Sequence, residues 1–258
     1  MPSSPHPRLF KSKRIIEKKK STPFLPSNNE TYPLPTVLEI ISHIFENVNA
    51  NESKMYEIHP DRITTSHAVK STIDFARTLT YGEVEPESIA MLIPKLKMTS
   101  SDIFYDLGCG TGKIVVQAAL TCPIRASKGI ELVDERVKEG TAALCRLNKM
   151  DMAANKRITI VQGDILHPPC IAPVVDATVI FINNVLFGPE LMFHVKNTLR
   201  CCTKMTRLVT LRKICDRHRE RRCAAQDNIC SLFHTPETIQ IAVSWAASTT
   251  AYLYTRKM

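Results

Sequence analysis

The chain has 258 residues, of which 44% are apolar, and 34 Lys and Arg outweigh 25 Asp and Glu to give a formal net charge of +9. This length and apolar content exclude a wholly disordered or collagen-like chain. No stretch approaches the roughly 20 apolar residues of a membrane span, and the first residues lack the apolar run of a secretory signal peptide, so we expect no membrane partner.

Residues 1–29 are predicted to form a basic disordered tail. The segment holds five prolines, and its first 20 residues contain seven Lys or Arg against one acid, Glu17. Such a composition is typical of a solvated arm, of a nuclear-import signal and of a nucleic-acid-binding arm. Composition alone does not separate these alternatives.

Residues 30–98 are predicted to form a small N-terminal helical region. Apolar residues recur at helical spacing, and Pro86 suits the first turn of a helix. The three expected helices cover about residues 37–45, 66–79 and 86–93. Tyr81-Gly82-Glu83, between the last two, is predicted to be a turn.

From residue 99 to residue 258 the pattern changes to strands and helices in alternation. Strands are expected at residues 103–107, 127–131, 158–162, 178–183 and 207–211, and a closing antiparallel pair at 239–243 and 251–254. Helices are expected at residues 113–120, from the second strand to about Asn155, and after Pro189. Alternating βα units indicate an α/β domain with a mostly parallel sheet, whose ligands bind at the carboxyl ends of the strands.

Three of the eight glycines fall within five residues, in Asp106-Leu107-Gly108-Cys109-Gly110-Thr111-Gly112. This loop lies where a strand ends and a helix begins, and glycines there let the backbone approach a ligand closely. Many α/β domains have a G-x-G-x-G loop. The acid before it is more informative, because the Asp106 carboxylate would repel a pyrophosphate and suits a cation such as the α-amino group of S-adenosylmethionine.

Acids also end the second and third predicted strands. Glu131 is placed to accept hydrogen bonds from ribose hydroxyls. Asp164 is placed to accept a hydrogen bond from the exocyclic amine of adenine, with Ile165 packed on the ring. Each acid alone is more often a solvated strand-end residue. Together with Asp106 at successive strand ends, they predict a site for S-adenosylmethionine.

The fourth predicted strand runs into Phe181-Ile182-Asn183-Asn184-Val185-Leu186-Phe187-Gly188-Pro189-Glu190. Two side-chain amides and two aromatic rings suit the reacting group at the mouth of the site. The same residues also suit a turn with a buried aromatic ring, because Asn and Gly are common in turns.

The run VIFINNVLFGPE, residues 179–190, resembles the fourth-strand motif of the Dot1 family of histone lysine methyltransferases. Residues 106–112, Glu131 and residues 163–165 resemble the cofactor motifs of that family, and residues 81–83 resemble its cofactor-covering loop. Residues 243–245 followed by Tyr252 resemble its carboxyl-terminal signature. The resemblance spans about residues 75–258 in the correct order, and compact versions in kinetoplastid protozoa have a similar short layout.

The chain departs from the family pattern at four positions near these motifs. The family often has Gln where this chain has Lys113, Ser where it has Cys109, and Thr where it has Val84. Leu132 follows Glu131, where the family has Lys or another polar residue. The departures leave the cofactor site intact and bear on the substrate details.

The resemblance implies a class I S-adenosylmethionine-dependent methyltransferase with a Rossmann-like, seven-stranded, mostly parallel sheet. The cofactor-binding residues that it implies are Tyr81, Glu83, Asp106, Gly108, Gly110, Thr111, Gly112, Lys113, Glu131, Asp164, Ile165 and Asn183. The catalytic residues that it implies are Phe181, Asn183, Phe187 and Tyr252, with Trp245 and Tyr252 lining a substrate channel. Trp245 and Tyr252 also suit a core position. Methyl transfer from a sulfonium needs no metal.

The implied substrate is a lysine on the globular surface of histone H3 in the nucleosome, which places the protein in the nucleus as a chromatin regulator. The basic tail and the stretch from Lys196 to Arg222, where ten Lys or Arg face two acids, are expected to contact nucleosomal DNA or an acidic histone surface. Three alternatives remain open: a methyltransferase of the same fold acting on nucleic acid or another protein, one acting on a small molecule, and a non-catalytic chromatin-binding module. An N-P-P-aromatic motif, which would favour a nucleic-acid substrate, is missing.

Nine cysteines at irregular spacing, with no C-x-x-C, argue against a disulfide framework. His218, Cys223, Cys230 and His234 come nearest to a metal-binding set. Because the paired short spacings of structural zinc sites are absent, we expect reduced thiols and no metal.

Overall fold

The computed structural model describes residues 31–46, 48, 80, 82–150, 152, 156–226 and 228–257. The predicted basic tail, the helix expected at residues 66–79 and Tyr81 lie outside the described residues. Among the helices that are described, none is both long and apolar enough to cross a lipid bilayer.

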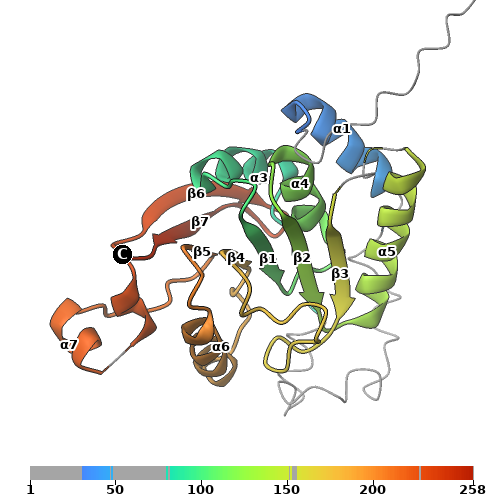
Figure 1. Ribbon diagram of the computed structural model, residues 1–258. Helices are drawn as coiled ribbons and strands as arrows, with labels where there is room; N and C mark the ends of the chain where they lie inside the picture. The colour runs from blue at the N-terminus through green and yellow to red at the C-terminus, as the bar shows by residue number, and fades with distance from the viewer. Residues whose placement is uncertain are drawn as a thin grey trace, which may run out of the picture.

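Seven strands form one sheet (Figure 1). In chain order they are β1 (Ile103–Leu107), β2 (Ala126–Glu131), β3 (Ile158–Gln162), β4 (Val179–Ile182), β5 (Arg207–Thr210), β6 (Glu237–Val243) and β7 (Ala246–Thr255). Their spatial order is β3-β2-β1-β4-β5-β7-β6. The first five strands are parallel, whereas β7 runs antiparallel to both β5 and β6. The expected Rossmann-like, seven-stranded, mostly parallel sheet is therefore confirmed.

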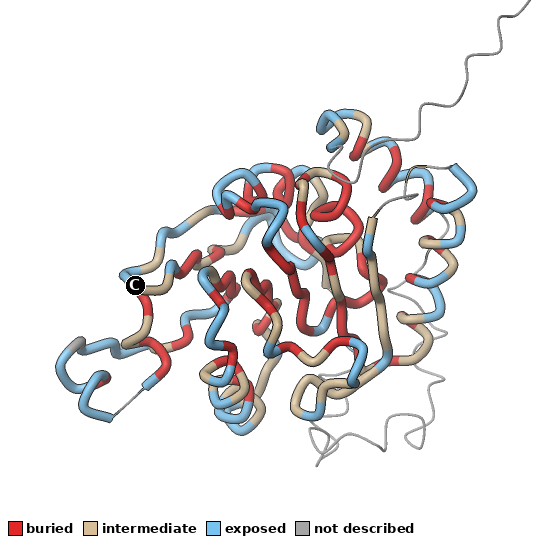
Figure 2. Tube along the Cα trace, in the orientation of Figure 1, coloured by how far each residue is buried: buried red, intermediate tan, exposed pale blue. Residues whose placement is uncertain are grey.

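Helices cover both faces of the sheet, so the central parallel strands β1 and β4 are buried on both sides. All five residues of β1 are buried, with Tyr105 in the apolar cluster on one face and Phe104 in the cluster on the other. On the Phe104 side lie α3 (Pro86–Leu92), the short helix η3 (Ile93–Leu96) and α4 (Lys113–Thr121). On the Tyr105 side lie α6 (Pro189–Cys201) and η4 (Ile229–Leu232). Figure 2 shows the buried residues concentrated in the strands and in the helix faces that meet them.

The N-terminal helix α1 (Leu34–Ile44) packs into the same core. Its buried residues lie against α4 and α5 (Asp134–Lys149); they are Val37, Ile40, Ile41 and Ile44. Arg146 of α5 adds a hydrogen bond of 2.6 Å from its Nε to the carbonyl oxygen of Ile44. Each buried aliphatic side chain stabilises the fold by ~1.5–3 kcal/mol relative to an exposed one. The helix expected at residues 37–45 is thus confirmed as part of the fold.

Most boundaries lie within three residues of the sequence-based expectation, and two differ by five residues or more. The helix expected to reach about Asn155 ends at Lys149, because its buried face ends at Leu147 and the chain turns at Met150. The closing strands are longer than expected, since β7 already begins at Ala246 and pairs back with β6 across a tight turn. The first half of β7, Ala-Ala-Ser-Thr-Thr, is exposed or partly exposed and contains no large apolar residue, so a search for apolar runs does not find it.

Candidate functional site

The carboxyl ends of the parallel strands border a cavity of about 340 Å³. Twelve of the predicted site residues line it: Glu83, Asp106, Gly108, Gly110, Lys113, Glu131, Asp164, Ile165, Phe181, Asn183, Phe187 and Trp245. Strand order reverses between β1 and β4, so this edge is the switch point at which open α/β sheets bind ligands.

The glycine loop forms the floor between β1 and α4. Gly108, Gly110 and Gly112 have φ values of 83°, 56° and 85°, a left-handed conformation that glycine adopts without strain. The amide of Gly108 donates a hydrogen bond of 2.9 Å to the carbonyl oxygen of Ile130 in β2. Thr111 is fully buried, and neither it nor Gly112 is a lining residue. These two predicted cofactor residues therefore belong to the loop but do not face the cavity.

Asp106 is a buried carboxylate that faces the cavity. Only 2% of it is exposed, and its Oδ1 has no hydrogen-bond partner among the described residues. Burial, and then the charge of Glu131, raise the pKa of Asp106 well above its usual value. An unpartnered buried carboxylate of this kind fits a ligand that brings a cationic hydrogen-bond donor.

Glu131 ties the glycine loop to the end of β2. Its Oε2 accepts a hydrogen bond of 2.8 Å from the amide of Gly110, and its Oε1 accepts one of 3.0 Å from the amide of Val133. Arg136 adds an ion pair, with 3.4 Å between Nη1 and Oε1. Both carboxylate oxygens keep acceptor capacity toward the cavity, so the predicted contact with ribose hydroxyls stays open to a ligand.

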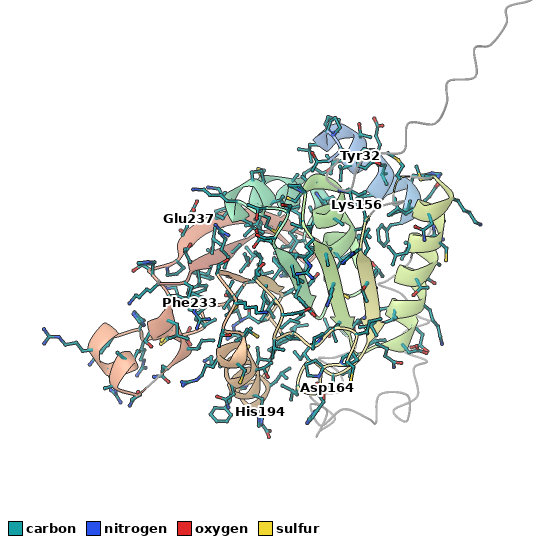
Figure 3. All side chains as sticks on the ribbon, in the orientation of Figure 1. Tyr32, Lys156, Asp164, His194, Phe233 and Glu237 are labelled. Atoms are coloured by element: carbon teal, nitrogen blue, oxygen red, sulfur yellow. The ribbon has the colours of Figure 1, made fainter. Side chains whose placement is uncertain are left out.

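Asp164 and Ile165 form the far wall of the cavity, after β3. Figure 3 shows Asp164 at the carboxyl edge of the sheet. Its Oδ1 accepts a hydrogen bond of 2.9 Å from the amide of Leu166, and its Oδ2 lies 3.6 Å from Nδ1 of His167. These contacts fix the carboxylate beside the apolar side chain of Ile165, which is the pairing predicted for an adenine site.

The covering strip, residues 82–84, lines the cavity and is held by hydrogen bonds to Ser244 and by an ion pair with Lys113. The amide of Glu83 donates to Ser244 Oγ, and the amide of Ser244 donates to the carbonyl oxygen of Glu83, both at 2.9 Å. The carboxylate of Glu83 also pairs with Lys113, with 2.5 Å between Oε2 and Nζ. Lys113 thereby holds the covering strip against the start of α4.

Trp245 lies against the covering strip, and Asn183 reaches it from β4. A Cβ added at Gly82 would clash with the indole ring of Trp245, so glycine permits this close approach. The Nδ2 of Asn183 lies 3.4 Å from the carbonyl oxygen of Gly82, to which it donates. Trp245 is 40% exposed, which rules out the alternative of a core position.

The two neighbouring asparagines have different surroundings. Asn183 lines the cavity, whereas Asn184 is only 1% exposed and does not. The Oδ1 of Asn184 accepts hydrogen bonds from the amides of Leu211 (3.0 Å) and Arg212 (2.7 Å), and its Nδ2 donates to the carbonyl oxygen of Arg212 (3.1 Å). Asn184 therefore joins the ends of β4 and β5, and of the two asparagines only Asn183 faces the cavity.

Tyr252 is the predicted catalytic residue that the structure does not bring to the cavity lining. It lies in β7 opposite Thr210 and packs, half-buried, against the core cluster. The ammonium of Lys213 lies 5.7 Å from the centre of its ring. This placement matches the core alternative considered for Tyr252. Tyr81, a predicted cofactor-binding residue, lies outside the described residues.

Sequence reasoning missed several residues of the lining. Arg136, only 5% exposed, comes from the first turn of α5, where its charge has no pattern that distinguishes it from a surface arginine. The missed apolar residues form much of the wall: Ile114, Leu132, Val185, Leu186 and Leu191. Val185 and Leu186 lie between Asn184 and Phe187 in the run of residues 179–190. Their place between two predicted site positions is the signal in the sequence that could have found them.

The described lining combines four carboxylates with two basic side chains and a largely apolar wall. Such a cleft suits a ligand with a cationic amino end, a hydroxylated middle and a flat apolar ring. With the strand order, it defines a Rossmann-like domain of the class I methyltransferase type.

Comparisons with known proteins agree with this class. The family model described as histone methylation protein DOT1 matches residues 63–256. The chain belongs to this family, as its motifs indicated.

Two curated relatives show how much of the chain is shared. A histone-lysine N-methyltransferase of Caenorhabditis elegans, named as H3 lysine-79 specific, is 33% identical over 176 residues, covering 66% of this chain and 19% of that protein. A Candida albicans protein of the same name is 28% identical over 183 residues, covering 67% and 13%. The chain thus spans a fifth or less of the length of these relatives.

Among solved structures, an RNA methyltransferase of Salinibacter ruber matches 67% of this chain and 93% of its own, with 18% identity and a TM-score of 0.47.

Proposed function

We propose that the protein is an S-adenosylmethionine-dependent histone-lysine N-methyltransferase that acts on a lysine of the globular surface of nucleosomal histone H3. The observation that carries the proposal is the assembly of Asp106, Glu131, Asp164, Asn183 and Trp245 around one cavity, in a chain of the DOT1 family. The relatives described above are named for lysine 79 of histone H3. We infer a nuclear location from the histone substrate.

The residues of the cavity fit the cofactor. Oδ1 of Asp106 is a buried acceptor with no hydrogen-bond partner in the described part of the chain, and it is suited to the ammonium group. Glu131 is suited to the ribose hydroxyls, and Asp164 with Ile165 to the adenine ring. The glycine loop lets the backbone lie close to the methionine portion. The bound cofactor would supply an electrophilic methyl group on its sulfonium.

The mouth of the cavity suits a neutral lysine amine. A lysine amine has an ordinary pKa near 10.4. Contact with apolar walls favours its uncharged form, which is the nucleophile, and Phe187, Leu186 and Trp245 supply such walls. Asn183 would orient the amine through its amide group. In-line positioning of this kind can contribute ~7–11 kcal/mol to a transfer reaction.

The basic segments extend the proposal to the nucleosome as partner. The described part of the stretch from Lys196 to Arg222 exposes Arg212, Lys213, Arg217, Arg219, Arg221 and Arg222. The tail of residues 1–29, outside the described residues, adds seven Lys or Arg. Nucleosomal DNA is a dense polyanion, so contacts with these cations would give salt-dependent affinity.

Methyl transfer from labelled S-adenosylmethionine to nucleosomes, histone octamer, free histone H3 and free DNA tests the function. We expect label on histone H3, most of it from nucleosomes, and mass spectrometry should locate it on a lysine of the globular surface. Gly108→Arg should abolish transfer, because a side chain at φ 83° is strained and fills the cavity. Met91→Ala, at an exposed position outside the lining, is the matched control.

Label on DNA alone, or on no substrate, would overturn the proposed function. Equal transfer by Gly108→Arg and wild type would show that the cavity is not the active site. Deleting residues 1–20 should weaken nucleosome binding at low salt and leave cofactor affinity unchanged; unaltered nucleosome affinity would refute the role of the tail.

A further inference from the structure

The segment between β5 and β6 gathers four metal-ligating side chains outside the cavity. Cys215, His218, Cys223 and Cys230 each offer one ligand atom, and all four atoms lie within 4.8 Å of one another. The Sγ atoms of Cys215 and Cys223 are 4.0 Å apart, and Nδ1 of His218 lies 3.3 Å from Sγ of Cys230. None of the four is a lining residue of the cavity.

These distances fit the coordination shell of one tetrahedral zinc ion. Zinc binds cysteine sulfur at ~2.3 Å and histidine nitrogen at ~2.0–2.1 Å, so its ligands lie about 3.8 Å apart for two sulfurs and about 3.6 Å apart for sulfur and nitrogen. The separations of 4.0 Å between Cys215 and Cys223 and 3.3 Å between His218 and Cys230 lie within a few tenths of an ångström of these values. Three thiolates and one imidazole form a closed structural set, and thiolates favour zinc over magnesium or calcium.

The ligands come from three neighbouring pieces of the chain. Cys215 and His218 precede the short helix α7 (Glu220–Ala225), Cys223 lies in α7, and Cys230 lies in η4. The sequence alone groups His234 with His218, Cys223 and Cys230 and predicts no metal. The backbone of His234 instead pairs with Thr255 of β7, and Cys215 takes its place in the cluster.

A bound metal ion would stabilise the segment that contains α7. Helix α7 has six residues and no side-chain hydrogen bond at its N-terminus, and it lies in a lobe beside the sheet (Figure 1, orange). Residues 216–219 and 221–222 are exposed, as Figure 2 shows for most of the lobe. Isolated helices of this length are unstable in water. The buried residues Cys223 and Cys230 bring the cluster to the edge of the core, where an ion would join the lobe to η4.

We propose that Cys215, His218, Cys223 and Cys230 bind one structural zinc ion, which fixes the exposed basic lobe to the sheet. The three thiols release their protons to solvent on binding, and the neutral imidazole binds through Nδ1. The arginines between Cys215 and Cys223 are then held at the surface in one arrangement. The site is independent of the cofactor cavity.

Metal analysis of the full chain, purified without added metal and under reducing conditions, tests the proposal. Mass spectrometry should find about one zinc per chain in the wild type. Cys215→Ser and Cys230→Ser should each lose most of it, whereas His218→Cys should retain it, because four thiolates also bind zinc tetrahedrally. Cys145→Ser and Cys170→Ser, at exposed cysteines outside the cluster, are the matched controls and should keep the metal.

Cobalt(II) titration of the demetallated wild-type chain gives a readout that needs no variant. We expect the visible absorption of tetrahedral cobalt and the charge-transfer band of thiolate ligation, both displaced by zinc. A wild type without zinc and without this spectrum would overturn the proposal. So would equal zinc loss in Cys145→Ser and Cys215→Ser, or a disulfide between Cys215 and Cys223 in the reduced preparation.

Discussion

Replacing Asp106 by Asn should have opposite effects on stability and on cofactor binding. The buried carboxylate lowers the free energy of unfolding of the ligand-free protein, yet it is proposed to bind the cofactor. Burial, and then the charge of Glu131, raise the pKa of Asp106 in the folded state. A raised folded pKa means that the folded chain binds the proton more firmly than the unfolded chain does. The contribution of Asp106 to stability is therefore complete below about pH 4, the ordinary aspartate pKa, and declines as the pH rises toward the folded value.

The size of the effect follows from the buried charge of Asp106, which asparagine lacks and whose Oδ1 finds no hydrogen-bond partner among the described residues. An unsatisfied buried polar group costs ~1–3 kcal/mol. For chains of about this size, 1 kcal/mol shifts the unfolding midpoint by roughly 2–4 °C. Asp106→Asn should thus raise the midpoint by about 2–12 °C at pH 8, and by little near pH 4.5. A ligand at a hundred times its Kd stabilises the wild type by ~2.7 kcal/mol, and the variant should lack this gain.

Thermal unfolding from pH 4.5 to pH 8, with and without S-adenosylhomocysteine, measures both effects. Asp102→Asn is the matched control, because Asp102 is also buried but accepts hydrogen bonds from Thr99 and Thr178. That variant should lose stability by ~1–3 kcal/mol and keep the ligand-induced shift. The reasoning is refuted if Asp106→Asn lowers the midpoint at pH 8, or if its ligand-induced shift equals that of the wild type.

Three further variants separate binding, catalysis and stability. Asn183→Ala should lower single-turnover methyl transfer about 10- to 100-fold, since it removes an orienting amide, and should lower the unfolding midpoint less than Asn184→Ala does, since its two hydrogen bonds are long, at 3.4 Å; a normal rate would contradict this role. Asn184→Ala should lower the free energy of unfolding in a denaturant titration by ~2–4 kcal/mol, because three hydrogen bonds are lost, and a midpoint like that of the wild type would count against it. Burial raises the pKa of Asp176, but hydrogen bonds from Lys128 and Tyr105 outweigh it and leave the pKa lowered. Its stabilisation is therefore present at pH 7 and lost below about pH 4, so Asp176→Asn should cost ~1 kcal/mol at pH 7 and less near pH 3; a cost independent of pH would disprove the link.

The core of the sheet could be predicted from sequence because its signals are local. The strands β1 and β3 have the expected bounds, since each is a mainly apolar run that a glycine follows, Gly108 after β1 and Gly163 after β3. The acids at the carboxyl ends of β1 and β2 and just after β3 reach one cavity because parallel strands end at the same edge of the sheet. Chain order alone is enough to place such residues.

Features that depend on packing between distant segments were not predictable in the same way. Asn183 and Asn184 are adjacent in sequence, and only the pairing of β4 with β5 turns one outward to the cavity and the other inward to Arg212. Tyr252 shares a motif with Trp245, yet the register of β7 places it opposite Thr210 and away from the lining. Cys215 joined its cluster only through the fold of α7 and η4.

The same strand ends connect the acidic cavity to the basic lobe. Asn184 holds the backbone of Arg212, and Nη1 of Arg212 donates a hydrogen bond of 3.2 Å to the carbonyl oxygen of Val185, a lining residue. Cys215 follows three residues later, so the lobe begins at the wall of the site. A surface that binds a polyanion must keep its cations away from a cavity that recognises a cationic ligand. Anchoring the lobe at Asn184 and at the proposed zinc ion meets both requirements, because it fixes the segment that carries the arginines outside the cavity lining.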